Sequence, residues 1–284
     1  MRLDQEEESH NIEDRRGMRV SRGMAGGGIG TIVIILIALF FGVDPSLLLQ
    51  GNVEQTGAPP PQSQPSARQD EMREFVARVL GSTERTWSEI FRAGGRTYEK
   101  PTLVLFSDAV QSACGSAQAA SGPFYCGADH KVYIDLSFYR DLRERFQAPG
   151  DFAQAYVIAH EVGHHVQNLL GIMGKVQSLQ SRARSESEAN QLSIRLELQA
   201  DCLAGIWASY AHRERNILEQ GDVEEGLNAA AQIGDDRMQK RMQGYVVPEG
   251  FTHGSAEQRV QWFRRGMENV DLKQCDTFSR RPLS

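Results

Sequence analysis

The sequence predicts an α+β fold in which a small antiparallel sheet lies over a central helix, preceded by one transmembrane helix. Three observations favour this class. Residues 23–43 carry no charge, two short stretches within 102–139 are rich in strand-favouring residues, and residues 151–210 show apolar side chains at helical spacing. With 284 residues, of which 40% are hydrophobic, the chain can form one sizeable globular domain with appendages.

The N-terminal region is predicted to be a cytoplasmic tail, residues 1–22, followed by a membrane span, residues 23–43. The tail is polar and charged, so we expect it to contribute nothing to a core. As a helix, the uncharged run would be about 31 Å long, which matches the hydrocarbon thickness of a bilayer. Four arginines precede it, whereas Asp44 and Glu54 follow it, so the positive-inside rule places the N-terminus in the cytoplasm. Residues 44–284 would then lie on the periplasmic side of the inner membrane.

Two other interpretations of the apolar run fit less well. A cleaved signal peptide is disfavoured by the long polar leader and by the lack of an Ala-x-Ala site after the run, and a buried core helix is weaker still.

Residues 44–69 are rich in Pro, Gln, Ser and Gly, which predicts an extended linker. The folded domain, residues 70–284, is expected to begin with an amphipathic helix that breaks near Gly81.

Charge and cysteine content limit the partners and the compartment. The formal net charge is −6 and the basic residues are scattered, so nucleic acid is not an expected partner. Four cysteines without a Cys-x-x-Cys pair predict two disulfides on the non-cytoplasmic side. We expect Cys114 to pair with Cys126, closing a short loop that contributes about 3 kcal/mol, and Cys202 to pair with Cys275 by subtraction. In the alternative, Cys202 is a small buried apolar residue of a helix.

Two strands are predicted before the first long helix. Residues 102–108, TLVLFSD, are apolar and favour a strand, and residues 131–139, KVYIDLSFY, alternate strictly between apolar and other side chains. The alternation predicts a half-buried antiparallel strand. This strand is either plain scaffold or an edge to which an extended peptide adds as a further strand.

The stretch HEVGHH lies within a predicted helix, residues 151–170. His160 and His164 are four residues apart, so both imidazoles can reach one metal ion from the same face. Glu161 lies near that face, where its carboxylate can take a proton from a water on the metal. His165 is turned about 140° from His160 and cannot join the pair in a regular helix. His-Glu-x-x-His alone occurs by chance in many proteins. A third metal ligand elsewhere in the chain is therefore needed to identify a zinc site.

A third ligand is predicted on a second helix, residues 185–210. The extended motif with a third histidine does not fit, since its positions hold Leu170 and Gln167. Within ELQAD, Glu197 and Asp201 are four residues apart on one face, so Glu197 can bind zinc while Asp201 accepts the second N–H of a histidine ligand. The alternative is a solvated charge pair, but neither acid has a Lys or Arg four residues away.

HEVGH followed by ELQAD resembles the gluzincin metallopeptidases. A closer resemblance is to a bacterial family of neutral zinc metallopeptidases that are single-pass membrane proteins. It rests on NIEDRRG, GPFYC, VYIDLSFY, AHEVGHHVQNLLG, RLELQADCLAGIW, IGDD and FTHGSAEQRVQWF. The resemblance implies a zincin-like fold, Zn2+ held by His160, His164 and Glu197, and Glu161 as the general base.

The stretch THGSAEQR is similar to a Thr-His-Pro…Arg segment of the related membrane proteases, with Gly254 where proline is usual. It suggests that His253 or Arg259 stabilises the oxyanion formed during amide hydrolysis. The alternative is a simple N-cap for the helix that follows. Tyr245 is a weaker candidate for the oxyanion role.

The sequence therefore predicts a membrane-anchored zinc metallopeptidase whose substrate is a protein or peptide. The rival is a zinc-containing envelope protein that docks partners without cutting them, and retention of Glu161 weighs against it. Zinc storage would need exposed, exchangeable ligands, whereas these lie between apolar turns. Residues 172–187 are expected to form a surface loop or connection.

Overall fold

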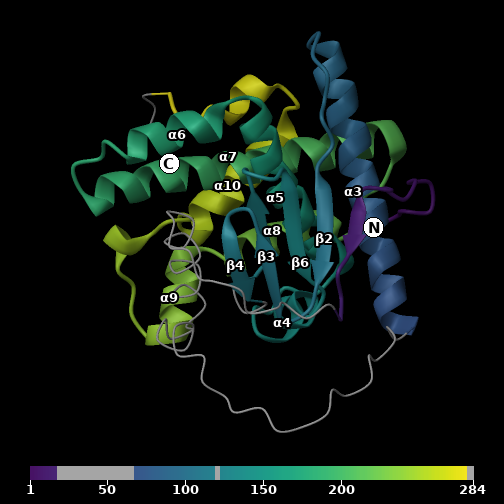
Figure 1. Cartoon of the computed structure of the whole chain (residues 1–284), viewed down its shortest axis with the longest axis horizontal. Coiled ribbons are helices and arrows are strands. Elements are labelled where there is room, and N and C mark those ends of the chain that lie inside the picture. Colours follow the sequence, from purple (N-terminus) through teal and green to yellow (C-terminus); the bar gives the residue numbers. More distant parts are fainter. Residues whose placement is uncertain (18–66, 119–121, 280–284) are drawn as a thin grey trace, which may run out of the picture.

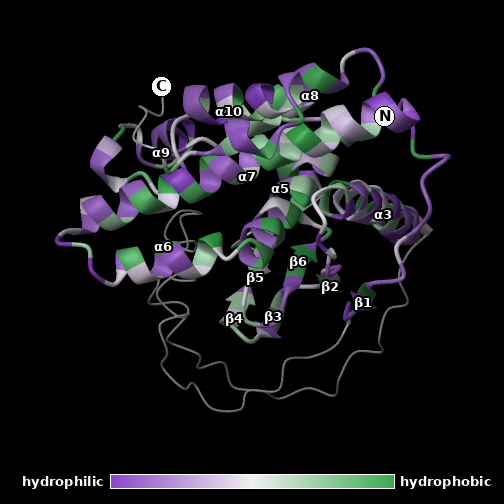
Figure 2. Ribbon diagram, turned by 90° about the horizontal axis from the view of Figure 1, so that it is seen from above, coloured by the Kyte–Doolittle hydropathy of each residue, from purple (hydrophilic) through white to green (hydrophobic). Residues whose placement is uncertain are grey.

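The computed structural model describes residues 1–17, 67–118 and 122–279, which form a layered α+β fold (Figure 1). Helices α3 and α5 lie between a small sheet and a second helical layer of α7, α8 and α10 (Figure 2). The described helices are α3 (Ala67–Ala93), α4 (Phe138–Glu144), α5 (Asp151–Leu169), α6 (Ile172–Gln180), α7 (Glu186–Arg215), α8 (Asp222–Gln232), α9 (Asp235–Gln243) and α10 (Ala256–Glu268), with 3-10 turns η2 (Pro248–Gly250) and η3 (Leu272–Cys275). The strands are β1 (Ile12–Asp14), β2 (Thr102–Phe106), β3 (Ala109–Ser112), β4 (Gly115–Gln118), β5 (Phe124–Cys126) and β6 (Lys131–Asp135).

The main sheet is mixed, so the prediction of an antiparallel sheet is wrong in part. Its strand order is β1-β2-β6-β5, and β2 runs parallel to both β1 and β6, whereas β5 and β6 are antiparallel. A separate hairpin, β3-β4, lies in the connection between β2 and β6. A connection of this length can cross over and return in the same direction, which permits parallel pairing.

Strand β6 differs from the half-buried antiparallel strand that its alternation predicted. It ends at Asp135 and lies inside the sheet, and its residues from Val132 to Asp135 are buried on both faces. The Asp135 carboxylate accepts hydrogen bonds from the backbone N–H groups of Asp108 and Ser137, at 2.9 and 2.8 Å, which stops the strand and starts α4. Strand β2 pairs with all five residues of β6 and β5 pairs with Lys131 to Tyr133, which leaves little of β6 for an added peptide strand.

Helix α5 is the centre of the molecule. Fifteen of its residues, including both motif histidines, are buried, because the sheet covers one side and α7 and α8 cover the other. Gly163 lies where α5 meets α7. A Cβ atom there would be 3.0 Å from the carbonyl oxygen of Ala200, so glycine lets the two helices approach at the level of the HEVGH motif.

Residues 1–17 belong to the folded domain, so the expectation that this segment adds nothing to a core is wrong for them. Strand β1 pairs with β2, and Leu3 and Glu6 are buried. The Arg215 guanidinium at the end of α7 donates a 2.6 Å hydrogen bond to the Glu6 carboxylate. Polar and charged residues can be buried when partners elsewhere in the chain neutralise them and form hydrogen bonds with them, as here. The polar composition of this segment therefore did not show that it lies outside the core.

Gly81 makes room for residues 1–17, here called the N-terminal arm, and does not break a helix. Helix α3 continues through it, which corrects the predicted break. A Cβ atom at Gly81 would lie 2.1 Å from the Glu7 carbonyl oxygen, and the Ser9 N–H donates a 3.0 Å bond to the carbonyl of Ala77 one turn away. The glycine therefore leaves room for the arm to cross α3.

Two further predictions concern the expected loop at residues 172–187 and the expected membrane span with its linker. Residues 172–180 form α6 instead of a loop, beginning directly after Gly171 in a left-handed conformation at φ 73°. The predicted span, residues 23–43, and most of the predicted linker, residues 44–69, lie outside the described residues. None of the helices in the described part of the chain is both long and apolar enough to cross a bilayer.

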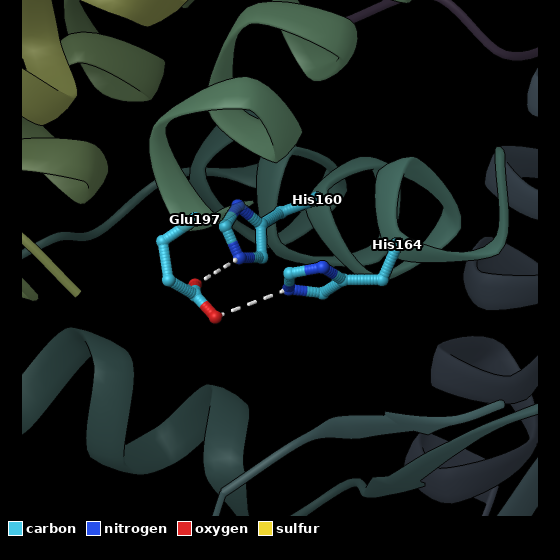
Figure 3. A group of neighbouring side chains, drawn as sticks. All are labelled: His160, His164 and Glu197. Carbon is cyan, nitrogen blue, oxygen red and sulfur yellow. Dashed lines mark hydrogen bonds and ion pairs between the residues drawn. The ribbon is translucent and has the colours of Figure 1, made fainter. Parts of the chain in front are cut away.

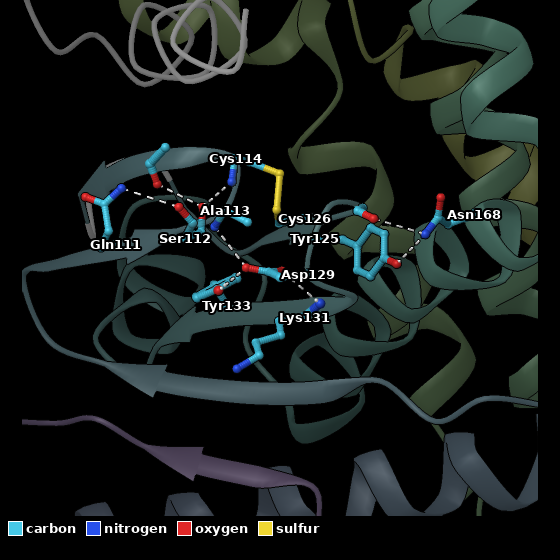
Figure 4. The surroundings of a disulfide bond; sticks show 12 residues. Gln111, Ser112, Ala113, Cys114, Tyr125, Cys126, Asp129, Lys131, Tyr133 and Asn168 are labelled. Carbon is cyan, nitrogen blue, oxygen red and sulfur yellow. Dashed lines mark hydrogen bonds between the residues drawn. A yellow bond between two sulfur atoms is a disulfide. The ribbon is translucent and has the colours of Figure 1, made fainter. Parts of the chain in front are cut away.

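Both predicted disulfides are present. Cys114 and Cys126 join the β3-β4 turn to strand β5, beside the hydrogen bonds of Asp129 (Figure 4). Cys202 of α7 pairs with Cys275 of η3 and closes a loop with a sequence separation of 73 residues. The second bridge holds the C-terminal segment against the helix that carries Glu197, so the alternative of an unpaired Cys202 is wrong.

Candidate metal centre

Three side chains from two helices converge at the contact of α5 and α7 (Figure 3). His160 and His164 come from adjacent turns of α5, and Glu197 points at them from α7. Glu197 has one carboxylate oxygen 3.1 Å from His160 Nε2 and the other 3.5 Å from His164 Nε2. The set contains both predicted histidines and the predicted third ligand.

The spacing of these atoms suits zinc. In a tetrahedral site with bonds of about 2.0–2.1 Å, two ligand atoms are about 3.3 Å apart, close to both distances observed here. One atom from each of the three residues lies within 4.8 Å of the others. Two imidazole nitrogens and one carboxylate leave a fourth position for water or substrate, which is the donor set of catalytic zinc sites. The residues therefore fit Zn2+.

Charges at the site favour binding of a cation. Burial alone would lower the pKa of His160, but the carboxylates of Asp201 and Glu197 outweigh it and raise this pKa to about 9. Burial raises the pKa of Glu197, but the charge of His164 and hydrogen bonds from both histidines hold it well below its usual value. Without a metal, this ionised carboxylate therefore attracts protons onto the imidazoles, and zinc must displace them to bind.

Glu161 lies beside the ligands and is 8% exposed. Burial raises its pKa, while the nearby charges of His164 and His160 oppose the rise. It is the neighbour of His160 on α5 and is absent from the triad that could hold the metal. A buried carboxylate close to a metal position but outside the ligand set has the placement that a general base requires.

Asp201 holds His160 in place from behind. One of its carboxylate oxygens lies 2.8 Å from His160 Nδ1 and also accepts a hydrogen bond from the hydroxyl of Tyr156. A carboxylate can only accept, so Nδ1 carries the proton and Nε2 presents its lone pair to the metal position. This is the contact that the sequence predicted between Asp201 and a histidine ligand.

Arg259 supports Asp201. Its side chain is fully enclosed, and Nε and one terminal nitrogen donate to the two oxygens of Asp201 at 2.8 and 2.9 Å. The other terminal nitrogen donates to the Ile233 carbonyl at 3.3 Å. All three guanidinium nitrogens thus donate to protein groups. Asp201, for its part, has a pKa of about 2, since Arg259 and His160 outweigh its burial.

His253 is held close to the metal centre by Asp235. One oxygen of Asp235 accepts from the backbone N–H groups of Thr252, His253 and Gly254 at 2.7, 2.6 and 3.0 Å, and the other lies 3.3 Å from His253 Nδ1. Burial lowers the pKa of His253, but the charges of Asp235 and Glu197 raise it overall. A Cβ atom at the next residue, Gly254, would lie 3.2 Å from the side chain of Leu198, so this segment lies against the turn of α7 that carries Glu197.

The alternative reading of THGSAEQR as a helix start also fits the structure. Ser255 is the N-cap of α10 and forms a capping box with Gln258. The segment thus starts a helix and positions His253 at the same time. Tyr245, by contrast, is 62% exposed, so its side chain lies on the surface.

His165 points away from the metal ligands, as its angle on the helix predicted. It is fully buried, with Nδ1 3.0 Å from the Tyr125 hydroxyl and Nε2 2.6 Å from the Glu99 carbonyl. Burial is the main cause that lowers its pKa to about 4, although the bond to Glu99 opposes it. His165 therefore fixes the sheet to α5 as a neutral side chain.

Acid should destabilise the protein through His165. Its folded pKa is below the unfolded value of 6.5, so the unfolded chain alone takes up this proton between pH 6.5 and 4. The stabilisation is complete above pH 6.5 and falls by about 3 kcal/mol on reaching pH 4. We expect urea unfolding across this range to show a shallower pH slope for His165→Phe than for wild type. Equal slopes for His165→Phe and wild type would contradict the prediction.

Sequence reasoning missed three side chains that position this centre. Tyr156 lies one helical turn before His160 and contacts Asp201, and Gln167 lies three residues after His164, with its amide oxygen 2.8 Å from His164 Nδ1. Their helical spacing from the ligands is a signal that could have found them. The third, Asp235, acts across 18 residues of chain, and spacing gives no indication of it.

The comparisons with known proteins agree with this centre. Residues 1–278 match a family described as "Putative neutral zinc metallopeptidase". The chain is 46% identical to the uncharacterized protein YpfJ of Escherichia coli strain K12, over 99% of each chain. It is 40% identical to the uncharacterized protein Rv2575 of Mycobacterium tuberculosis, over 73% of this chain and 71% of that protein. No solved structure matches. The match over nearly the whole chain and the zinc-compatible ligand set together show that this protein belongs to the family of neutral zinc metallopeptidases.

Proposed function

We propose that this protein is a zinc-dependent peptidase that hydrolyses peptide bonds with Glu161 as general base. The observation that supports this most is the buried Glu161 carboxylate beside a complete His–His–Glu ligand set. Holding the metal does not require this carboxylate, and its burial is unfavourable. A protein that only bound zinc would gain nothing from retaining it, whereas a hydrolase needs a proton acceptor at this position.

The residues of the centre have separate roles in hydrolysis. When bound, zinc lowers the pKa of a water molecule to about 7 and polarises the substrate carbonyl. Glu161 accepts a proton from the attacking water and passes it to the leaving amine nitrogen. Its raised pKa makes it a stronger proton acceptor than an exposed glutamate. Asp201 and Arg259 keep His160 in the tautomer that leaves Nε2 available.

His253 is the oxyanion donor in this scheme. Asp235 binds its Nδ1 and raises its pKa, which favours an imidazole that donates from its other nitrogen. Donors of this kind act when negative charge develops on the former carbonyl oxygen.

Replacing His253 should impair turnover without loss of metal. We expect His253→Gln to lower kcat by about 10²–10³-fold, the effect of removing one oxyanion donor. Zinc content should equal that of wild type, because His253 is outside the ligand triad. Steady-state cleavage of a peptide and metal analysis on the same sample check both. A drop in zinc content would make His253 a ligand, and an unchanged kcat would remove it from the mechanism.

The proposal is tested by removing the metal and restoring it. The purified full-length protein is assayed against casein and a peptide library, then after dialysis with a chelator, then after addition of one equivalent of Zn2+. We expect cleavage to disappear and return with the metal. Zinc bound at one per chain with no cleavage of any library member would overturn the proposal and favour the docking protein. The full chain is used, because residues 1–17 are part of the fold.

A further inference from the structure

The second zinc histidine is positioned by two buried glutamines that lead to the Cys202–Cys275 disulfide. Gln167 Nε2 donates to the carbonyl of Leu196 on α7 at 2.7 Å, and a carbonyl can only accept. This bond fixes the orientation of the Gln167 amide, so its oxygen is the atom that faces His164 Nδ1. Nδ1 must then carry the proton, which leaves Nε2 of His164 for the metal.

Gln167 is in turn held by Gln199. The Gln167 amide nitrogen donates to Gln199 Oε1 at 3.1 Å, and Gln199 Nε2 donates to the Cys275 carbonyl at 2.8 Å. Gln167 and Gln199 are 0% and 7% exposed, so each bond is made where water cannot replace it. The path from His164 to Cys275 is therefore continuous, from α5 across α7 to η3.

The disulfide fixes the far end of this path. Cys275 is bonded to Cys202, which is three residues after Gln199 on the same face of α7. Thr277 adds a 2.6 Å hydrogen bond from its hydroxyl to the carbonyl of Arg195, four residues before Gln199. The C-terminal segment thus lies along α7 with the Cys275 carbonyl aimed at Gln199.

We propose that Gln167 and Gln199, anchored by the Cys202–Cys275 disulfide, are positioning residues that set the zinc affinity of this centre through His164. Loss of an orienting partner behind a metal-bound histidine commonly weakens metal binding by about 10–100-fold. Among the described residues, hydrogen bonds connect Gln199 and the disulfide to His164 through Gln167, so we expect their effects not to add to that of Gln167. This inference rests on the metal site alone and holds whether or not the protein cleaves peptides.

Zinc affinities from chelator competition test the proposal on the full-length protein. We expect Gln167→Leu to raise the zinc Kd by about 10–100-fold. Gln199→Leu and the double variant Cys202→Ser/Cys275→Ser should raise it by less. Combined with Gln167→Leu, neither should raise it further, because the path is already broken. The matched control is Cys114→Ser/Cys126→Ser, which removes a disulfide that does not lead to a ligand and should leave the Kd unchanged.

Several results would overturn this inference. Wild-type affinity in Gln167→Leu would show that His164 needs no orientation from Gln167. Effects that add in the combined variants would mean that Gln199 and the disulfide act by general stability. Circular dichroism identifies folded variants, and if Gln167→Leu does not fold, Gln199→Glu carries the test. Its carboxylate still accepts from Gln167 but cannot donate to Cys275, so an affinity equal to wild type would exclude the disulfide from the path.

A second inference concerns the two ends of the apolar run. Residues before and after it are joined in one fold, since β1 pairs with β2 and Arg16 donates a 3.1 Å bond to the Gln69 carbonyl. The buried Glu6–Arg215 ion pair adds a second connection. A single membrane crossing between residues 17 and 67 would place these partners on opposite sides of a bilayer, where they could not meet. We infer that residues 1–17 and residues 70–279 lie on the same side of the membrane.

Cysteine labelling in intact cells tests this arrangement. The four native cysteines are in disulfides, so a single added cysteine is the only reactive thiol. The exposed positions Gln5→Cys and Glu186→Cys are each treated with a membrane-impermeant maleimide before and after lysis. We expect the two sites to behave alike in intact cells, both reactive or both protected, and both to react after lysis. Reaction of one site alone in intact cells would overturn the inference and restore the single-span topology.

Discussion

Glu161→Gln should sharply lower the rate of peptide cleavage while leaving zinc binding intact. The amide has the size of the carboxylate but cannot accept a proton, so the general base is lost without a change in packing. General bases typically contribute about 10²–10⁴-fold to the rate, and we expect kcat/KM to fall within this range. Zinc content should stay at the wild-type level, because Glu161 is outside the set of His160, His164 and Glu197 that could hold the metal.

The same measurement separates the base from the ligands. Glu197→Gln should lose zinc and activity together, and the exposed Glu186→Gln at the start of α7 should lose neither. Metal analysis and peptide cleavage are made on the same preparations. Residual cleavage by Glu161→Gln at the wild-type rate would assign the proton transfer to another group. Loss of zinc in Glu161→Gln would instead show that this carboxylate helps to bind the metal.

The metal centre was predictable because its geometry is local to two helices. Spacing by four residues places His160 beside His164 and Glu197 beside Asp201, and no tertiary information is needed for either pair. What spacing cannot give is the distance between the helices. Gly163 sets it by allowing α5 to approach Ala200, and only the structure shows that this glycine faces a helix and not solvent.

The misjudged parts of the fold depend on long-range contacts. The N-terminal arm reads as a solvated tail, but Glu6 is neutralised by Arg215, more than two hundred residues away in the chain. Gly81 reads as a helix break because its crossing partner, Glu7, lies in that arm. Alternation in 131–135 predicted one solvated face, whereas the sheet places β6 inside with both faces covered. In each case the local pattern describes the residues correctly. The contact that changes their structural role comes from another part of the chain, which the pattern does not include.

Asp201→Asn should damage both the stability of the fold and the affinity for zinc. The change leaves the enclosed Arg259 guanidinium without its counter-charge, and breaking a buried pair from one side costs about 3–5 kcal/mol. His160 also loses its charged acceptor, so zinc affinity should fall by about 10–100-fold. The pKa of Asp201 is about 2, so its stabilisation is complete above pH 3.8 and is lost only as the pH falls through 2.

Removing the charge of Arg259 as well distinguishes the two roles of Asp201. In Asp201→Asn/Arg259→Met no unpaired charge remains buried, so unfolding free energy should recover relative to Asp201→Asn alone. Zinc affinity should not recover, because the histidine still lacks its carboxylate. Urea denaturation and chelator competition on the three proteins measure these quantities separately. Recovery of both would mean that Asp201 acts on zinc only through the stability of the α5–α7 contact, whereas recovery of neither would mean that Arg259 stabilises the fold by packing and not by its charge.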